Sequence, residues 1–273
     1  MNRRMSDGMN LWQRLGLVIA VAIFGAAMMA ADCDKPEIKV LSLGDSWAAG
    51  WDTALEKELR EEGHKATLWN KGIPGSTAAA WTNDAVLFDT LATLVGNLDI
   101  KYVMISLGGN DVLQNYKVNG VGDAIFPQVN ASLHNVINDI LSVRPGINIY
   151  LNGYDFLNFE QTTECILIGE EVLGGNTDYK NHVIARLQDE IAAVAADYPN
   201  VYNRNNMGVM QADAGIPFAP VYALPTPTSH MGSGDCIHPN EKGYRAIHDA
   251  IYDVFFGPLS ADQAIEEFFE QAS

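Results

Sequence analysis

Short apolar runs alternate along the chain with stretches in which apolar residues recur every three or four positions. The runs predict buried strands, and the helical spacing predicts amphipathic helices between them. Strands are expected at residues 38–43, 66–69, 102–107, 147–151 and 201–202. Helices are expected over residues 47–62, most of 77–98, 129–141, 183–194 and 241–255. This alternation predicts an α/β domain with a parallel sheet of about five strands and helices on both faces.

Two segments interrupt the alternation. Residues 158–179 and 203–234 lack a clear period, and the second is rich in Pro, Gly, Asn and Ser. We expect both to be loops over a site, because long irregular connections in compact domains usually carry function. No interdomain linker is visible, so residues 32–273 are predicted to form a single domain.

The N-terminus has the pattern of an export signal. Three arginines precede a 17-residue uncharged apolar run, residues 15–31, which ends in small residues. This is typical of a secretory signal cleaved near Ala30 or Ala31; the alternative is an uncleaved anchor. We therefore expect a secreted or periplasmic protein with no stable membrane insertion once the signal is removed.

Composition and charge narrow the function classes. The chain has 273 residues, of which 48% are hydrophobic, so it can bury a core and is not disordered. Lys and Arg number 17 against 34 Asp and Glu, a formal net charge of -17. Because binding to phosphates needs a basic face, this balance excludes nucleic acid as the expected partner. The oligomeric state is left open.

The chain has three cysteines. Cys33 lies in the expected start of the mature chain, which leaves Cys165 and Cys236 as the plausible disulfide pair in an oxidising compartment; the alternative is two separate thiols. The chain contains no CxxC motif and no Cys/His cluster, so no metal site is expected.

Polar clusters follow several of the predicted strands. They are Gly44-Asp45-Ser46, the segment 70–76, the segment 108–111 and, before the last helix, the segment 235–239. In a parallel sheet, ligands bind beyond the carboxyl ends of the strands. We therefore expect one crevice to collect all four clusters.

These residue types fill every role of an acyl-transfer site. The Ser46 hydroxyl needs a base to become a nucleophile, and His238 can be that base. Asp235 can fix the imidazole tautomer from three residues away. The Ser46 N–H, the Gly75 N–H and the Asn110 amide can stabilise an oxyanion.

These four motifs, in this order, resemble the SGNH hydrolases, the GDSL-type esterases and lipases. The resemblance spans residues 38–255 and implies a three-layer α/β/α sandwich of flavodoxin-like type that needs no cofactor. It assigns Ser46, Asp235 and His238 to a catalytic triad, and Gly75 and Asn110 to the oxyanion hole. Gly72 is a second candidate donor. The α/β-hydrolase elbow is a poorer match, because its serine normally follows several strands.

Further residues are expected near the crevice. Trp47 is placed to line an acyl pocket or to join the core. Tyr154 and Asp155 follow the fourth strand, so we expect them to contact substrate. Asp45 and Asp111 are predicted to brace loops, and a bridge from Cys165 to Cys236 would pin the Asp235–His238 loop. His230 is interpreted as an ordinary loop residue.

The leading prediction is a secreted serine hydrolase that cleaves carboxylic esters, with short-to-medium acyl esters or lipids as substrates. An O-acetyl esterase acting on polysaccharide is the alternative. A non-catalytic exported binding protein with the same fold is the competing hypothesis from another class.

Overall fold

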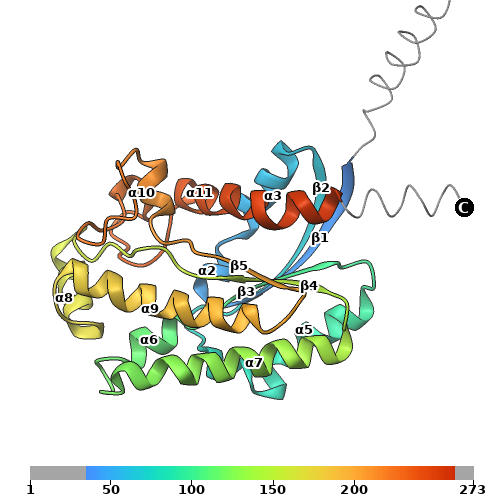
Figure 1. Ribbon diagram of the computed structural model, residues 1–273, viewed down its shortest axis with the longest axis horizontal. Helices are drawn as coiled ribbons and strands as arrows, with labels where there is room; N and C mark the ends of the chain where they lie inside the picture. Colours follow the sequence, from blue (N-terminus) through green and yellow to red (C-terminus); the bar gives the residue numbers. More distant parts are fainter. Residues whose placement is uncertain (1–34, 262–273) are drawn as a thin grey trace, which may run out of the picture. The chain divides into compact units, whose positions relative to one another are not determined.

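A five-stranded sheet forms the centre of the computed structural model, which describes residues 35–261 (Figure 1). The predicted signal segment lies outside these residues. The strands are β1 (Lys35–Gly44), β2 (His64–Gly72), β3 (Tyr102–Ser106), β4 (Asn148–Asn152) and β5 (Val201–Arg204). Their order is β2-β1-β3-β4-β5, and β1–β3, β3–β4 and β4–β5 pair in parallel. This is the strand order of flavodoxin-like sheets.

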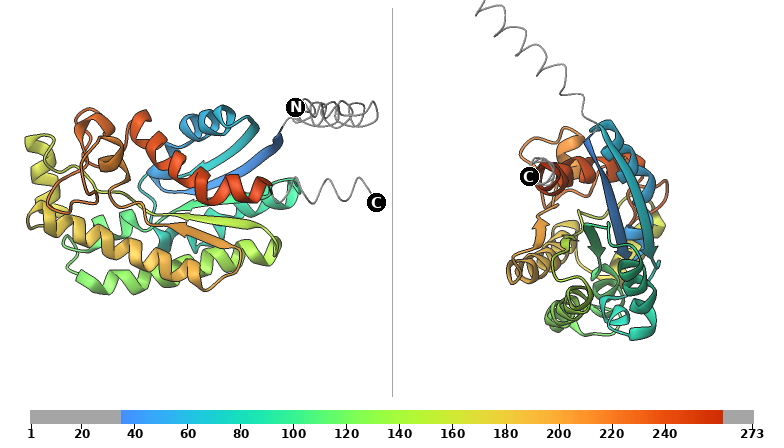
Figure 2. Two further views of the ribbon diagram at one scale, coloured as in Figure 1. Left: turned by 45° about the horizontal axis from the view of Figure 1, so that its top comes forward. Right: turned by 90° about the vertical axis from the view of Figure 1, so that its right-hand side faces the viewer.

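Helices cover both faces of the sheet, which confirms the three-layer prediction (Figures 1 and 2). One layer holds α3 (Asp52–Glu61) and α11 (Glu241–Ile251), and the other holds α5 (Asp84–Gly96), α7 (Ile125–Val143) and α9 (Thr177–Ala196). Shorter elements connect the layers: α2 (Ser46–Ala49), α4 (Ala78–Trp81), α6 (Gly109–Asn115), η1 (Gly122–Ala124), α8 (Thr163–Val172), α10 (Val209–Asp213), η2 (Thr228–His230) and η3 (Tyr252–Phe256).

The apolar periodicity accounts for the core. Every residue of β3 is buried, as expected of a central strand with helices on both faces. The stripe of α7 that includes Leu133 and Ile137 is buried against the sheet. Each fully buried side chain of this size contributes about 1.5–3 kcal/mol. Phe255 and Phe256 follow α11 and make edge contacts with Tyr102.

Several predicted boundaries shift for local reasons. The predicted helix at 77–98 is two helices, because the Asn83 side chain accepts a hydrogen bond from the Ala85 N–H and starts α5. The predicted helix at 47–62 divides at Gly50 into α2 and α3. The prediction of an irregular loop over 158–179 is wrong for α8. Thr162 caps that helix by accepting from the Cys165 N–H.

The strand order fixes where a ligand can bind. The chain leaves β1 on one side to reach β2 and returns to β3 on the other, so the connections diverge between β1 and β3. Such a switch point opens a crevice at the carboxyl ends of the two strands. Ser46 follows β1 and Asn110 follows β3. Within residues 35–261, no helix is both long and apolar enough to span a bilayer.

Candidate active site

A glycine sets the position of Ser46. Gly44 ends β1 at φ +139°, and a Cβ there would lie 2.1 Å from the Ser106 carbonyl oxygen. Only a residue without a side chain allows β1 to end this close to β3. The next N–H, of Asp45, donates to that same carbonyl at 2.9 Å. The turn then starts α2, with Ser46 half-buried at the crevice.

Three side chains form one hydrogen-bonded row. The Ser46 Oγ lies 2.7 Å from His238 Nε2, and His238 Nδ1 lies 2.8 Å from Asp235 Oδ2. A carboxylate on Nδ1 favours the tautomer with its proton there, which leaves the Nε2 lone pair facing the hydroxyl. The row can therefore take a proton from Ser46 as its oxygen attacks an electrophile.

The Asp235 carboxylate is held by its own loop. Burial by itself raises the pKa of Asp235. Hydrogen bonds from the His238 and Ile237 N–H groups, both at 2.9 Å, and from the His238 ring outweigh this burial and hold the pKa below its usual range. Asp235 is therefore ionised at neutral pH and can stabilise a protonated imidazole.

Asn110 borders the same space as Ser46. The Asn110 side chain donates one N–H to the Ser76 carbonyl at 3.0 Å, and an amide nitrogen carries a second N–H. Gly75 is exposed in the neighbouring loop at φ +80°, and a Cβ there would meet nothing within 4 Å. The rival donor, Gly72, already donates to Asn70 Oδ1 at 2.7 Å. These contacts favour Gly75 and Asn110 over Gly72 as donors to a bound oxyanion.

Two buried carboxyls brace this site. Asp45 accepts from the Trp47 N–H at 2.9 Å and from the Tyr154 hydroxyl at 2.5 Å. Burial raises the pKa of Asp45 to about 6, against these two hydrogen bonds, which lower it. Asp111 accepts from the Ala78 N–H at 2.7 Å at the start of α4, and burial raises its pKa as well. Both carboxyls tie loops together beside Ser46.

A small apolar cavity opens beside Ser46. Its enclosed volume is about 20 Å³, and it is open to solvent on one side. Trp47 and Tyr154 line it as expected, and their rings meet edge to face at 5.1 Å. The aliphatic part of the lining was not predicted from the sequence; it consists of Leu113, Leu157, Ile184 and Ile237.

Part of this lining could have been predicted from the sequence. Leu113 is three residues after Asn110 on α6, so the two share a helix face. Ile237 lies between Asp235 and His238. Ile184 is an inward residue of α9 like its apolar neighbours, and only the packing of α9 shows that it borders the cavity.

Asp155 does not have its expected place. It is fully buried, and its carboxylate accepts from the backbone N–H groups of Phe156, Gly208 and Met210 at 2.6–2.7 Å. Burial raises its pKa to about 6, although these bonds lower it. The expectation of substrate contact is corrected: Asp155 joins the end of β4 to the start of α10 and does not line the cavity.

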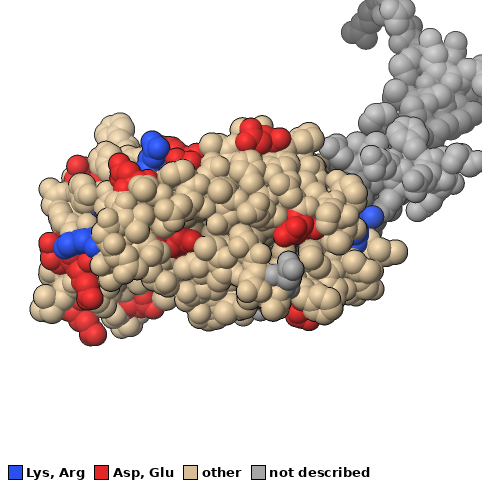
Figure 3. All heavy atoms as spheres, turned by 90° about the horizontal axis from the view of Figure 1, so that it is seen from below, with Lys and Arg blue, Asp and Glu red and all other residues tan. Residues whose placement is uncertain are grey.

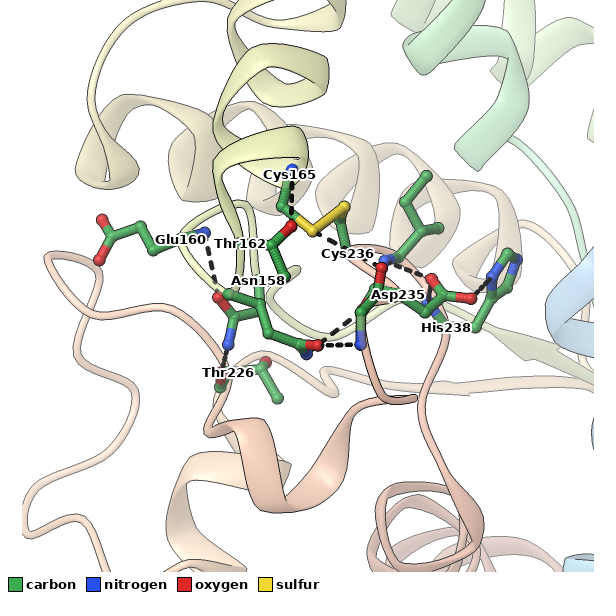
Figure 4. Close-up of a disulfide and its surroundings, with 11 residues drawn as sticks. Asn158, Glu160, Thr162, Cys165, Thr226, Asp235, Cys236 and His238 are labelled. Carbon is green, nitrogen blue, oxygen red and sulfur yellow. Dashed lines mark hydrogen bonds and ion pairs between the residues drawn. A yellow bond between two sulfur atoms is a disulfide. The ribbon is translucent and has the colours of Figure 1, made fainter.

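The two later cysteines form a disulfide, with Cα atoms 5.4 Å apart (Figure 4). Cys236 therefore joins the Asp235–His238 loop to α8. Among residues 35–261, no three His, Cys, Asp or Glu side chains gather in a way that could hold a metal ion.

A hydroxyl, an imidazole and a carboxylate in one row beside amide donors form the arrangement on which acyl-transfer hydrolases are built. The sequence matches a family model in agreement with this chemistry. Residues 21–251 match the model for GDSL-like lipases and acylhydrolases, so the chain belongs to that family and is a carboxylic ester hydrolase.

Solved structures share the fold at low sequence identity. An acetylxylan esterase from Geobacillus stearothermophilus is 16% identical, with 81% of this chain and 95% of that one covered and a TM-score of 0.54. A family 3 carbohydrate esterase from Clostridium thermocellum is 19% identical, with 82% and 98% covered and a TM-score of 0.51. No curated protein sequence matches this chain.

Proposed function

We propose that this protein is an exported serine hydrolase that removes short acyl groups from esters through a Ser46–His238–Asp235 triad. The observation that carries this proposal is the row of contacts at 2.7 and 2.8 Å that joins the three side chains. Export rests on the three arginines and the apolar run at the N-terminus. Sequencing the N-terminus of the exported protein tests it, with a new start near residue 31 or 32 expected.

The geometry supports a two-step reaction. Ser46 Oγ attacks the ester carbonyl while His238 Nε2 takes its proton. The Ser46 and Gly75 N–H groups and the Asn110 amide stabilise the tetrahedral oxyanion. His238 returns the proton to the leaving alcohol as the ester C–O bond breaks. Water, activated by the same imidazole, then cleaves the acyl-enzyme and restores Ser46.

The cavity supports a short acyl group. Bulky side chains surround it, among them Trp47, Leu113 and Ile184, and the enclosed space between them is only about 20 Å³, room for about one water. The methyl of an acetyl group comes closest to filling this space, and each further CH₂ of a propionyl or butyryl group that is buried contributes about 0.8 kcal/mol. A long acyl chain would need these side chains to move.

A carbohydrate O-acetyl ester is the second candidate substrate. The small acyl cavity fits an acetyl group, and two structures with this fold are named as esterases of acetylxylan and of carbohydrate. The acidic balance of the chain, 34 Asp and Glu against 17 Lys and Arg, supports a neutral rather than a polyanionic substrate. On the face in Figure 3, Asp and Glu recur across the surface, whereas Lys and Arg show at few places.

Hydrolysis of a p-nitrophenyl ester series from acetate to palmitate tests the acyl length, with acetylated xylan as the carbohydrate arm. We expect kcat/KM to be highest at acetate to butyrate and to fall by tenfold or more at longer chains. Preference for palmitate would contradict the short-acyl proposal. If no ester is turned over and a fluorophosphonate probe fails to label Ser46, the binding-protein hypothesis replaces this one.

A further inference from the structure

The loop that carries the base and the acid is joined to a region that is distant in the sequence. Cys236 lies between Asp235 and His238 and forms the disulfide with Cys165, which is 71 residues away on α8 (Figure 4). Cys165 and Cys236 are both buried. The bridge therefore fixes the middle of the loop to a helix that contributes nothing else to the triad.

Hydrogen bonds join the same two segments. The Asn158 N–H donates to the Cys236 carbonyl at 2.9 Å, and the Gly234 N–H donates to Gln161 Oε1 at 2.5 Å. Asn158 is itself buried and donates its side-chain amide to the Thr226 carbonyl at 2.7 Å. Residues 158–165, which we call the anchor segment, thus contact the loop on both sides of Asp235.

Within residues 35–261, the loop's other backbone hydrogen bonds are internal or at its base. The Gly232 N–H donates to the His238 carbonyl at 3.0 Å, and Met231 forms an isolated bridge with Pro239. Asp235 holds the backbone of Ile237 and His238 through its own carboxylate. These bonds keep Asp235 and His238 together, but they do not fix the pair relative to Ser46 at the end of β1.

We propose that the Cys165–Cys236 disulfide and Gln161 are positioning residues that hold the Asp235–His238 pair at hydrogen-bonding distance from Ser46. The inference rests on the proposed function of these three residues. Its physical basis is the steep dependence of catalysis on geometry, because a misplacement of about 1 Å can cost about 10²-fold in rate. Without the anchor, the imidazole would sample positions from which it cannot take the Ser46 proton.

The test compares Cys165→Ala/Cys236→Ala with the wild type, with kcat expressed per active site titrated by a fluorophosphonate. We expect kcat per titrated site to fall about 10- to 100-fold, while KM changes less than about threefold. Partial unfolding would lower the number of titrated sites without lowering kcat per site. Leu59→Ala, in the buried face of α3, is the matched control: it should lower the melting temperature with kcat per site unchanged.

Gln161 supplies a second variant that leaves the disulfide intact. Gln161→Leu removes the acceptor of the Gly234 N–H, and we expect kcat per site to fall about threefold to tenfold. Gln161→Glu keeps the acceptor of the Gly234 N–H but loses the amide that donates to the Asp235 carbonyl at 3.5 Å, so it should recover only part of that loss. Wild-type kcat per site in both the double cysteine variant and Gln161→Leu would overturn the proposal.

A readout independent of turnover separates this proposal from the proposed function. The proton shared by His238 Nδ1 and Asp235 should give a far-downfield proton resonance, assigned by its loss in His238→Gln. Because Asp235 and His238 stay paired, that resonance should persist in the double cysteine variant. The His238 Hε1 signal should instead broaden by exchange in that variant, because the contact between the imidazole and Ser46 would form and break. An inactive wild type would sink the proposed function, and a sharp, unshifted Hε1 signal in the double variant would sink the positioning role.

Discussion

Residues 35–261 contain two Ser–His–Asp rows, and only one of these lies at the crevice. In the first, His238 connects Asp235 to Ser46. In the second, His230 Nε2 lies 2.7 Å from Asp213 Oδ2, and its Nδ1 lies 3.0 Å from Ser229 Oγ. The distances are nearly the same, so they do not distinguish a reactive row from a structural one.

Burial and surroundings make the difference. The His238 side chain is 36% exposed, whereas that of His230 is 0% exposed. His238 turns Nε2 toward a serine at the start of α2, beside the apolar cavity and the Asn110 amide. The second serine is the neighbour of its histidine in η2, and this row ties η2 to α10. A row becomes a reaction centre only where a substrate carbonyl and its oxyanion donors can meet the hydroxyl.

Replacing the serine of each row should give the largest difference in kcat between the two rows. Ser46→Ala should lower kcat by about 10⁴- to 10⁶-fold, because it removes the nucleophile. Ser229→Ala should leave kcat within about twofold of the wild type. Turnover of p-nitrophenyl acetate measures both, and equal losses in the two variants would erase the distinction.

Removing the amide beside the first row should give the next largest effect. Asn110→Ala should lower kcat by about 10²- to 10³-fold with a small change in KM, because the amide acts on the oxyanion. Asn119→Ala is the matched control, since its amide donates to the Asn115 side chain from an exposed position outside the site. A loss below threefold in Asn110→Ala would show that the oxyanion is held by other donors.

The second row should affect stability instead of rate. His230→Ala leaves a space in a fully buried site and breaks the contact to Asp213, so we expect a loss of about 2–4 kcal/mol in the free energy of unfolding. Urea denaturation measures this loss. The kcat per titrated site should stay within about threefold, and a fall of 100-fold would give His230 a part in the reaction.

The smallest expected effect is a pH dependence. The hydrogen bond from His230, assisted by Lys242 and opposed by partial burial, holds the pKa of Asp213 below its usual value of 3.8. A carboxyl with a lowered folded-state pKa stabilises the fold above that usual value, and this stabilisation is lost as pH falls through the folded-state pKa. Asp213→Asn should therefore have a lower urea midpoint than the wild type at pH 7, and the gap should close below about pH 4. If the difference in urea midpoint between the two proteins grew as the pH falls, the conclusion that folding lowers the pKa of Asp213 would be wrong.

Much of the fold followed from local pattern. The apolar runs identified all five strands, because a central parallel sheet needs near-continuous apolar segments. The edge strand β2 is longer than its apolar centre, since polar residues, among them the buried His64 and the half-buried Asn70, extend it at both ends. The helix α8 was missed because its outer face carries apolar residues, Ile166 and Leu167, which hide the helical period.

The candidate site also contains some residues that local motifs predict and others that they do not. Ser46, Asn110 and His238 could be placed from short motifs, because each follows or precedes a regular element at a fixed offset. The prediction for Asp155 was wrong because local sequence does not show which way a carboxylate after a strand turns. It can face the crevice, or it can turn inward and accept from backbone N–H groups, as it does here. Ile184 and Leu157 border the cavity through tertiary packing, which leaves no trace in local sequence.

Ser46 and His238 lie 192 residues apart in the chain and meet in one hydrogen bond. The nucleophile is synthesised early, and its proton acceptor comes only after all five strands have been made. A growing chain could assemble the sheet and expose Ser46 without being able to cleave an ester. With the proposed triad, the site is complete only when the segment leading into α11 returns to the start of the sheet.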